Sequence, residues 1–335
     1  MNLNPGSEAA ETGIERYARA HGMLERLEDR VSFSPVRRSL AARIKLAEIE
    51  ALSWVDDASL TEGDFIIDRR GRIGFSEFSL LRWQSALSEE ISLKELEHDP
   101  DAILRWLGVS DERPVVTARS ANDLREAISA WIEHCRRLPP SPPLLRSAQI
   151  AKLWRDFSPL AQGDRLASIL IGDRWGPGRW KGSAGGLLAL GLKIEQAPWR
   201  RAEGSDLENI WLQAIIAGAR HHLDLEAALR AYAGRVAHQL ADRKRSDTLK
   251  RLLHLAMSRP SVTSGVVAQS LKITSAGAIK LLGTAQQLGL LIERSGQASY
   301  RSYMVPVTSI RPPSPARTPF EPDFWATTIE NEGDF

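Results

Sequence analysis

The sequence contains a single cysteine among its 335 residues, and it contains no long apolar run. One thiol, Cys135, cannot form a disulfide framework or a zinc site built from several cysteines. No stretch approaches the roughly 18 apolar residues of a membrane-spanning helix, which excludes an integral membrane protein. The segment 1–12 is polar and acidic, unlike the apolar stretch of a signal peptide. These absences predict a cytoplasmic protein that has no membrane partner.

Motifs of several common enzyme classes are also missing. The chain has no GxSxG nucleophile motif, no Walker phosphate-binding loop and no GxGxxG dinucleotide fingerprint. His221 and His222 are adjacent, whereas a zinc-binding pair on one helix needs the spacing of HExxH. We therefore expect neither a metal nor a cofactor, and we expect Cys135 to be a small buried apolar side chain.

The chain does contain many apolar residues at helical spacing. Apolar residues make up 43% and charged residues 26% of the sequence, values typical of a globular protein of two or three domains. The spacing predicts an all-α fold, a helical bundle with one small β-hairpin around Gly71. The proline run 139–143 is interpreted as an elbow within one helical body. The main helices of this body are expected at residues 14–30, 35–51, 77–88, 93–107 with a break at Asp99-Pro100, 121–138, 144–157, 165–174, 187–193, 207–222 and 225–242.

Positive charge is concentrated near the carboxyl end. Residues 243–303 hold ten lysines and arginines but only Asp247 and Glu293 as acids, a net charge of +8 against +2 for the whole chain. A near-neutral body that carries one strongly basic module is typical of proteins that bind a polyanion.

The same basic segment predicts the elements of a winged helix-turn-helix, in the order helix, helix, turn, helix and hairpin. Ser264 is expected to cap the second helix, and Thr274 or Ser275 the third. Gly289 suits the left-handed position that ends the third helix. The inner stripe of that third helix is expected to consist of Ala278, Ile279, Leu282 and Ala285.

The third helix of such a module presents its outer face to the major groove of DNA, beginning near its N-terminus. That face contains no arginine or asparagine for bidentate reading of a base. We therefore expect modest specificity, or specificity supplied by dimer spacing and DNA shape. The predicted DNA-binding residues are Lys272, Thr274, Ser275, Lys280, Thr284 and Gln287, together with Arg294 and Arg301 on the hairpin.

Residues 143–165, with the sequence PLLRSAQIAKLWRDFSPLAQGDR, resemble the Fic family. Fic enzymes carry the motif HPFx[D/E]GNGR between two helices and transfer AMP or a related phosphate-bearing group to a protein hydroxyl. Many of them have a C-terminal winged helix. The segment 47–57 is also similar to the inhibitory helix of that family. The resemblance implies a Fic-like helical bundle followed by the winged helix.

This sequence departs from the Fic motif at the positions that carry its chemistry. Ser158 stands in place of the histidine base, and a serine hydroxyl does not accept a proton near neutral pH. Gln162 stands in place of the magnesium-binding acid and is a weaker ligand for a hard cation. Gly163 is retained, but Asp164 replaces the asparagine and Arg165 follows without the second glycine. We therefore expect a degenerate loop with no catalytic residues, and no enzyme activity.

The whole chain further resembles an uncharacterised bacterial family, often plasmid-encoded, that joins a domain of unknown function to this type of helix-turn-helix. The expected organisation has four parts. These are a disordered N-terminus at 1–13, a Fic-like helical domain at 14–242, a winged helix-turn-helix DNA-binding domain at 243–305, and a disordered proline-rich, acidic tail at 306–335.

Together these observations predict a DNA-binding protein, a bacterial transcriptional regulator whose partner is double-stranded DNA. A homodimer is expected, because one recognition helix reads few base pairs and two half-sites multiply selectivity. The body would serve dimerisation or the sensing of a small-molecule or nucleotide effector. Two alternatives stay open. One is a cryptic nucleotidyl or phosphoryl transferase that uses Gly163 and Arg165, and the other is an adaptor that docks a protein through its winged helix.

Overall fold

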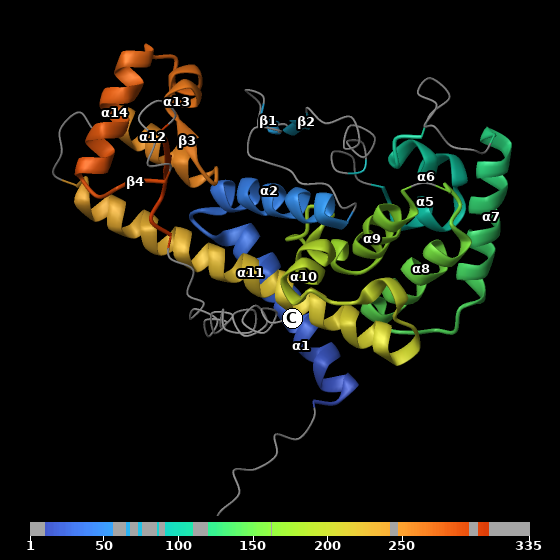
Figure 1. The fold of residues 1–335 in the computed structure, drawn as a ribbon. Helices are drawn as coiled ribbons and strands as arrows, with labels where there is room; N and C mark the ends of the chain where they lie inside the picture. Colours follow the sequence, from blue (N-terminus) through green and yellow to red (C-terminus); the bar gives the residue numbers. More distant parts are fainter. Residues whose placement is uncertain are drawn as a thin grey trace, which may run out of the picture.

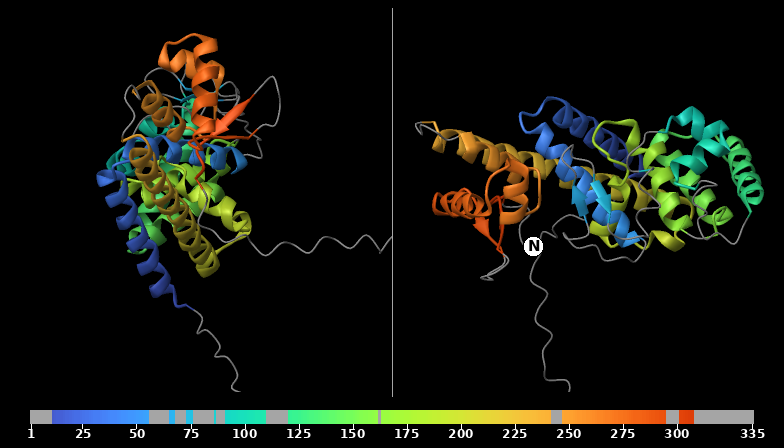
Figure 2. Two further views of the ribbon diagram at one scale, coloured as in Figure 1. Left: turned by 90° about the vertical axis from the view of Figure 1, so that its left-hand side faces the viewer. Right: turned by 90° about the horizontal axis from the view of Figure 1, so that it is seen from above.

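The fold is helical over the residues that the computed structural model describes, which are 11–55, 65–67, 73–75, 86, 91–109, 120–161, 163–241, 247–294 and 301–307. This confirms the predicted all-α class. The body contains α1 (Gly13–Phe33), α2 (Arg37–Val55), β1 (Phe65–Ile67), β2 (Ile73–Phe75), α5 (Leu93–His98), α6 (Pro100–Trp106), α7 (Ala121–Arg137), α8 (Pro143–Phe157), α9 (Asp164–Trp175), η2 (Pro177–Arg179), α10 (Leu187–Glu195), η3 (Trp199–Arg201) and α11 (Gly204–Gln239). The C-terminal module contains α12 (Asp247–Met257), β3 (Val262–Thr263), α13 (Ser264–Leu271), α14 (Ser275–Gln287), β4 (Ile292–Glu293) and β5 (Ser302–Met304). Figures 1 and 2 show this module at one end of an elongated molecule and α5–α8 at the other.

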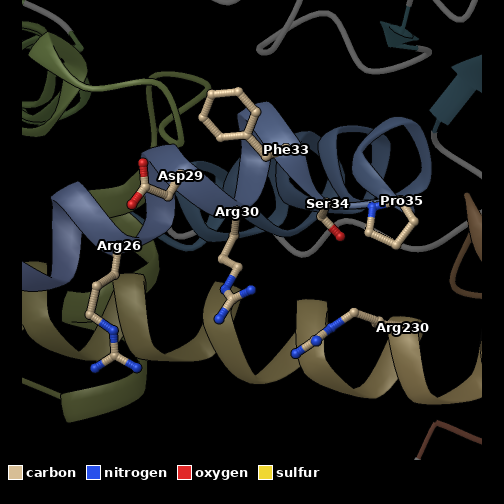
Figure 3. Close-up of a pocket in the computed structure, with 7 residues that line it drawn as sticks. All are labelled: Arg26, Asp29, Arg30, Phe33, Ser34, Pro35 and Arg230. Atoms are coloured by element: carbon tan, nitrogen blue, oxygen red, sulfur yellow. The ribbon is translucent and has the colours of Figure 1, made fainter.

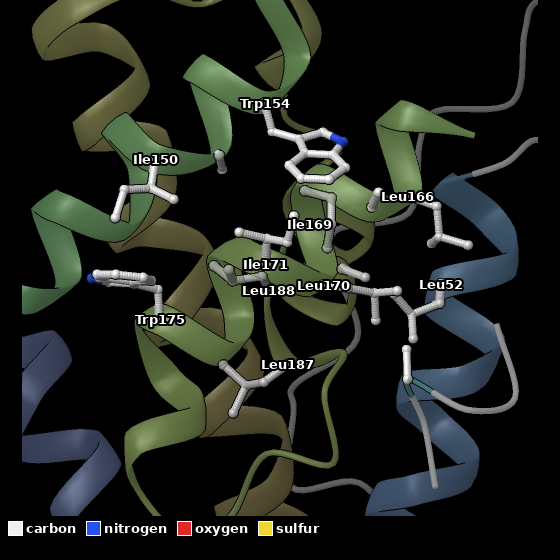
Figure 4. Packing of buried hydrophobic residues seen from close by; sticks show 14 of the residues in the cluster. Leu52, Ile150, Trp154, Leu166, Ile169, Leu170, Ile171, Trp175, Leu187 and Leu188 are labelled. Carbon is white, nitrogen blue, oxygen red and sulfur yellow. The ribbon is translucent and has the colours of Figure 1, made fainter. Parts of the chain in front are cut away.

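The larger hydrophobic core lies in the body, where α8, α9, α10 and the first half of α11 pack together (Figure 4). Trp131 and Trp154 meet edge to face in this core, with ring centroids 4.9 Å apart. A Cβ atom on Gly191 of α10 would overlap the backbone of Ala214, so the two helices cross at the closest approach that glycine allows. Cys135 is buried in the same core, as expected, and burial raises the pKa of its thiol to about 12.

Helix α11 connects this core with a second one. Its 36 residues span about 54 Å at 1.5 Å per residue. Leu207 and Trp211 near its start belong to the core of the body, whereas Leu229 and Tyr232 belong to the second core. The expected separate helices at 207–222 and 225–242 are therefore wrong. Neither glycine nor proline stands between them, and the intervening Leu223-Asp224 continues the helix.

The second core joins the C-terminal module to two helices of the body. It combines Leu252, Val267 and Leu282 of the module with Leu40 of α2 and Leu229 of α11. Two hydrogen bonds cross the same junction: the hydroxyl of Tyr232 donates to the carbonyl of Leu290 at 2.7 Å, and Arg43 Nε donates to the carbonyl of Met257 at 3.0 Å. The module thus rests on the body through an apolar face and not through a linker alone.

Several local expectations are confirmed. Asp99 caps α6 and Pro100 is its first residue, so the predicted break divides α5 from α6. The proline run separates α7 from α8, whose apolar faces share one core, in agreement with an elbow. β1 and β2 pair in the predicted antiparallel hairpin. The predicted helix at 77–88, apart from the buried, helical Ala86, and most of both termini lie outside the described residues. Within the described part of the chain no helix is long and apolar enough to cross a membrane.

Three buried polar residues form a network where α2, α9 and α11 meet. Glu48 Oε2 accepts from the backbone N–H groups of Ala184 and Gly186 at 2.7 and 2.8 Å. Glu48 Oε1 lies 2.9 Å from Nε2 of His222. Asp173 accepts from the hydroxyl of Ser183 and, at 2.9 Å, from the N–H of Leu188. All three charged or polar side chains are at most 1% exposed.

The burial of this network changes how its groups titrate. Removal from water raises the pKa of Glu48 to about 8. The pKa of Asp173 is raised to about 7, mainly by removal from water and also by the nearby charge of Glu48. Removal from water lowers the pKa of His222 to about 3. With Glu48 protonated and His222 neutral, the carboxyl donates to Nε2 of His222 while its other oxygen receives the two backbone donors. Buried Nδ1 of His222 has no partner among the described residues.

The network predicts a loss of stability as the pH rises from 6.5 to 8.5. The ordinary pKa values of Glu48 and Asp173 are 4.5 and 3.8, so their protonated forms favour the folded state, and this stability is lost as the pH rises through the folded values. The lowered pKa of His222 makes the stability rise with pH, but only below the ordinary pKa of 6.5 for this side chain. Each carboxyl lowers the free energy of unfolding by up to about 1.4 kcal/mol for each unit by which the pH rises. Urea denaturation followed at several pH values measures this change.

Glu48→Gln keeps the shape of the side chain but cannot ionise. The free energy of unfolding of this variant should therefore fall less steeply with rising pH than that of the parent protein. Glu50→Gln on the same helix is the matched control, because Glu50 is exposed. An unchanged pH profile in Glu48→Gln would contradict the assignment.

Candidate functional site

The C-terminal module has the element order and the sheet order of a winged helix-turn-helix. Its strands form a three-stranded antiparallel sheet in the order β3-β5-β4, so the last strand lies between the other two. Tyr303 in this central strand is buried and pairs with Val262 on one side and Glu293 on the other. Sequence reasoning missed β3, because a strand of two residues is too short to show an alternating pattern.

Helices α13 and α14 are capped by threonines. Thr274 Oγ1 accepts from the N–H of Gly277 at 3.1 Å, which confirms it as the predicted cap of α14. Thr263, and not the expected Ser264, caps α13, because its extended backbone lets its hydroxyl accept from the N–H of Val266. Gly289 adopts a positive φ of 67° directly after α14, as predicted for the residue that ends this helix.

The exposed residues of α14 are Ser275, Ala276, Ile279, Lys280, Gln286 and Gln287. Ile279 was expected on the inner stripe, and this is wrong: 60% of its surface is exposed. The buried positions are Ala278, Leu282 and Ala285, whose spacing of four and three residues follows one side of a helix. Ile279 is rotated about 100° from Ala278 and therefore faces outward.

The other predicted DNA-binding residues differ in their exposure and in the contacts of their side chains. Lys272 is exposed and has a left-handed backbone at the turn, with φ of 56°. Thr284 is half-buried, and its hydroxyl donates to the carbonyl of Lys280 at 2.9 Å. Arg301 is exposed and lies 3.6 Å from Glu293 across the sheet, and Arg294 is exposed as well.

The cations of the module lie on α12, on α14 and in the segments between the elements. Lys250 and Arg251 are exposed on α12, Lys280 on α14, Lys272 in the turn before α14, and Arg301 beside the sheet. Arg259 is partly buried, which lowers its pKa. The run at 243–245 lies outside the described residues.

The loop between α8 and α9, which holds the residues that were compared with the Fic motif in the sequence, is held together by one buried carboxylate. Asp164 is 8% exposed and accepts from the hydroxyl of Ser158 at 2.8 Å and from the N–H of Leu160 at 3.1 Å. Ser158 and Gly163 both have positive φ values, of 45° and 77°. Gln162 lies outside the described residues, and Arg165 is exposed.

These contacts give Asp164 a structural role in the loop. Its carboxylate lies in the first turn of α9, where the helix dipole favours a negative charge. A phosphate approaching the same helix end would meet that carboxylate and be repelled by it. The hydroxyl of Ser158 is already engaged with Asp164, so the loop brings Ser158, Gly163 and Asp164 together as a closed turn.

Comparisons with known proteins find little. No family model matches the chain, and no curated protein matches it. Among solved structures, one similar structure is the crystal structure of a Fic family protein from Desulfovibrio desulfuricans G20, with 14% sequence identity and a TM-score of 0.41. The match covers 92% of this chain and 100% of that chain.

The closed turn predicts that Asp164→Ala is destabilising. The substitution leaves the buried N–H of Leu160 and the hydroxyl of Ser158 without their acceptor, which costs about 1–3 kcal/mol for each unsatisfied buried group. Ser158→Ala is the matched variant: it removes one bond and leaves the Leu160 bond in place, so its cost should be smaller. Urea denaturation of both variants tests this, and equal stabilities of Asp164→Ala and the parent protein would refute the role of the carboxylate.

Proposed function

We propose that this protein is a DNA-binding protein of the bacterial transcription-regulator type, which docks α14 in the major groove of double-stranded DNA. The observation that supports this proposal most directly is the division of α14 into two faces. Ala278, Leu282 and Ala285 are buried in the second core, whereas Ser275, Lys280 and Gln287 point away from it. A helix held by its inner face can present the outer one to a groove.

The N-terminus of α14 suits a contact with the DNA backbone. The first N–H groups of a helix and its positive dipole end bind phosphate well. Here Thr274 caps the helix, Ser275 is exposed beside it, and the ammonium group of Lys272 extends from the preceding turn. Arg294 and Arg301 on the strands that flank the wing supply further cations for the phosphate backbone or the minor groove.

The module is placed so that a duplex can reach α14. Figure 1 shows α14 at the outer edge of the molecule, on the side of the module away from α2. The module contacts the body through α12, which packs against α2, and through the segment that follows α14, where the carbonyls of Leu288 and Leu290 accept from Gln239 and Tyr232 of α11. These contacts leave the outward face of α14 uncovered by the described residues.

The centre of the exposed face favours readout by shape. Ile279 can contact a thymine methyl group, and Gly283 leaves open space, since a Cβ atom there would meet nothing within 4 Å. A face of this kind makes few bidentate hydrogen bonds to bases. We therefore propose a homodimer, in which the spacing of two half-sites supplies selectivity, with the body serving dimerisation or ligand sensing.

A second candidate function is a protein-docking adaptor. It is favoured by the two apolar side chains exposed on the module, Ile279 at 60% and Ile292 at 44%. The two functions differ in their response to salt. Binding to DNA weakens steeply as salt rises because counterions are released, whereas an apolar protein contact does not.

Gly283 offers a test of the DNA interface without a steric cost. Gly283→Lys should strengthen binding and Gly283→Glu should weaken it, with affinities that differ by about tenfold or more, an energy of about 1.4 kcal/mol. Both variants replace a glycine in a helix and should fold at least as well as the parent protein. The measurement is a gel-shift titration against fragments of the source genome at two salt concentrations.

Gly22 on α1 provides the matched control pair, because a Cβ atom there also meets nothing within 4 Å. Gly22→Lys and Gly22→Glu should bind DNA alike. Equal affinities of Gly283→Lys and Gly283→Glu, or the absence of any retarded species at low salt, would reject the proposed function.

Lys280→Ala should lower the affinity for all DNA sequences to a similar degree. If Lys280 contacts one phosphate, the log–log slope of affinity against salt concentration becomes shallower by about 0.9. Lys94→Ala removes an exposed lysine from α5, at the opposite end of the molecule, and should leave the slope unchanged. A slope that stays the same in Lys280→Ala would place this lysine outside the interface.

A further inference from the structure

A basic cleft lies between α1 and α11, outside the C-terminal module. It measures about 440 Å³ and is lined by the end of α1, by the turn into α2 and by α11. Its charged lining residues are Arg26, Arg30, Arg230 and Asp29. Figure 3 shows Arg26 and Arg30 reaching from α1 toward α11, where Arg230 faces them. Three guanidinium groups from two helices therefore share one cleft with a single carboxylate.

Two of these arginines have no ionic partner in the part of the chain that the structure describes. Arg26 and Arg30 are exposed, and neither forms an ion pair with another described residue. They stand four residues apart on one face of α1, where like charges repel each other. An anion placed between them would relieve that repulsion, and two guanidinium groups can bind one phosphate through parallel N–H···O bonds.

The third arginine, Arg230, is positioned by a buried carboxylate on its own helix. Arg230 Nε lies 3.2 Å from Oε1 of Glu226, a carboxylate that is only 2% exposed. The same oxygen accepts from the hydroxyl of Ser34 at 2.7 Å. This pairing uses Nε of Arg230 and leaves its two terminal nitrogens as donors for a ligand. A guanidinium group oriented by a buried carboxylate loses less side-chain freedom when it binds an anion.

We propose that this cleft binds a small phosphorylated ligand that carries at least two negative charges. Its volume is in the range of sites for small molecules, and arginines that converge from facing helices suit the oxygens of a diphosphate or of the phosphates of a nucleotide. The cleft borders the second core, since Pro35 lines it and the adjacent Val36 is buried in that core. A bound diphosphate would bridge α1 and α11 beside the winged helix.

The test uses the full chain and inorganic pyrophosphate as the probe, without DNA, so that it is independent of the proposed DNA binding. Isothermal titration should show saturable binding of pyrophosphate, and binding should weaken about tenfold or more in Arg30→Ala and in Arg26→Ala. Both substitutions remove exposed side chains, and a thermal melt confirms that the variants fold. Arg220→Ala is the matched control on α11: Arg220 is exposed and does not line the cleft, and its removal should leave binding unchanged.

Two further titrations, one with sulfate and one with DNA, distinguish a specific diphosphate site from general anion binding and from DNA binding. Sulfate at the same ionic strength should bind more weakly than pyrophosphate, because it offers one anionic group and not two. A DNA backbone presents the same phosphate chemistry, so Arg30→Ala is also titrated with the duplex used for the gel shift. The proposal is overturned if pyrophosphate fails to bind, if Arg220→Ala weakens its binding as much as Arg30→Ala does, or if Arg30→Ala weakens only the binding of DNA.

Discussion

The contact between Glu48 and His222 holds α2 against α11, the two helices that connect the two hydrophobic cores of this molecule. Helices α2 and α11 each pass from one hydrophobic core into the other. On α2, Leu40 belongs to the second core and Leu52 to the first, and α11 runs between the same two cores. Glu48 and His222 lie between these apolar stretches, in a site from which water is excluded. A buried carboxyl is tolerated there only because it makes all of its hydrogen bonds.

The glycine-containing segment before α10 is built around the same carboxyl. Two backbone donors from alternate residues, the N–H groups of Ala184 and Gly186, converge on one oxygen of Glu48. Asp173 performs the same role for the N–H of Leu188 at the start of α10. Side chains would crowd this approach, since a Cβ atom at Gly186 would come within 2.9 Å of the carbonyl of Glu48. The orientation of α10 against α2 and α11 therefore depends on a polar contact inside an otherwise apolar body.

This architecture relates the proposed DNA-binding module to the rest of the chain. The module is fixed on the ends of α2 and α11 by an apolar core and by the hydroxyl of Tyr232. Any change in the angle between α2 and α11 would consequently move α14. The arginine cleft lies along α11 between the buried network and the module, where the turn from α1 into α2 also meets α11. The two proposals thus concern surfaces that the same pair of helices connects.

The amino-acid sequence by itself determined most of the helices, several of their caps and the order of helices and hairpin in the C-terminal module. These features depend on residues within a few positions of one another, as the Thr274 cap, the Pro100 helix start and Gly289 show. Only the tertiary structure decided the continuity of α11, the outward side of Ile279 and the pairing of Glu48 with His222, which are 174 residues apart. It also brought Arg30 opposite Arg230. Such pairings depend on which helix faces pack together, and local spacing alone does not specify a partner that is distant in the chain.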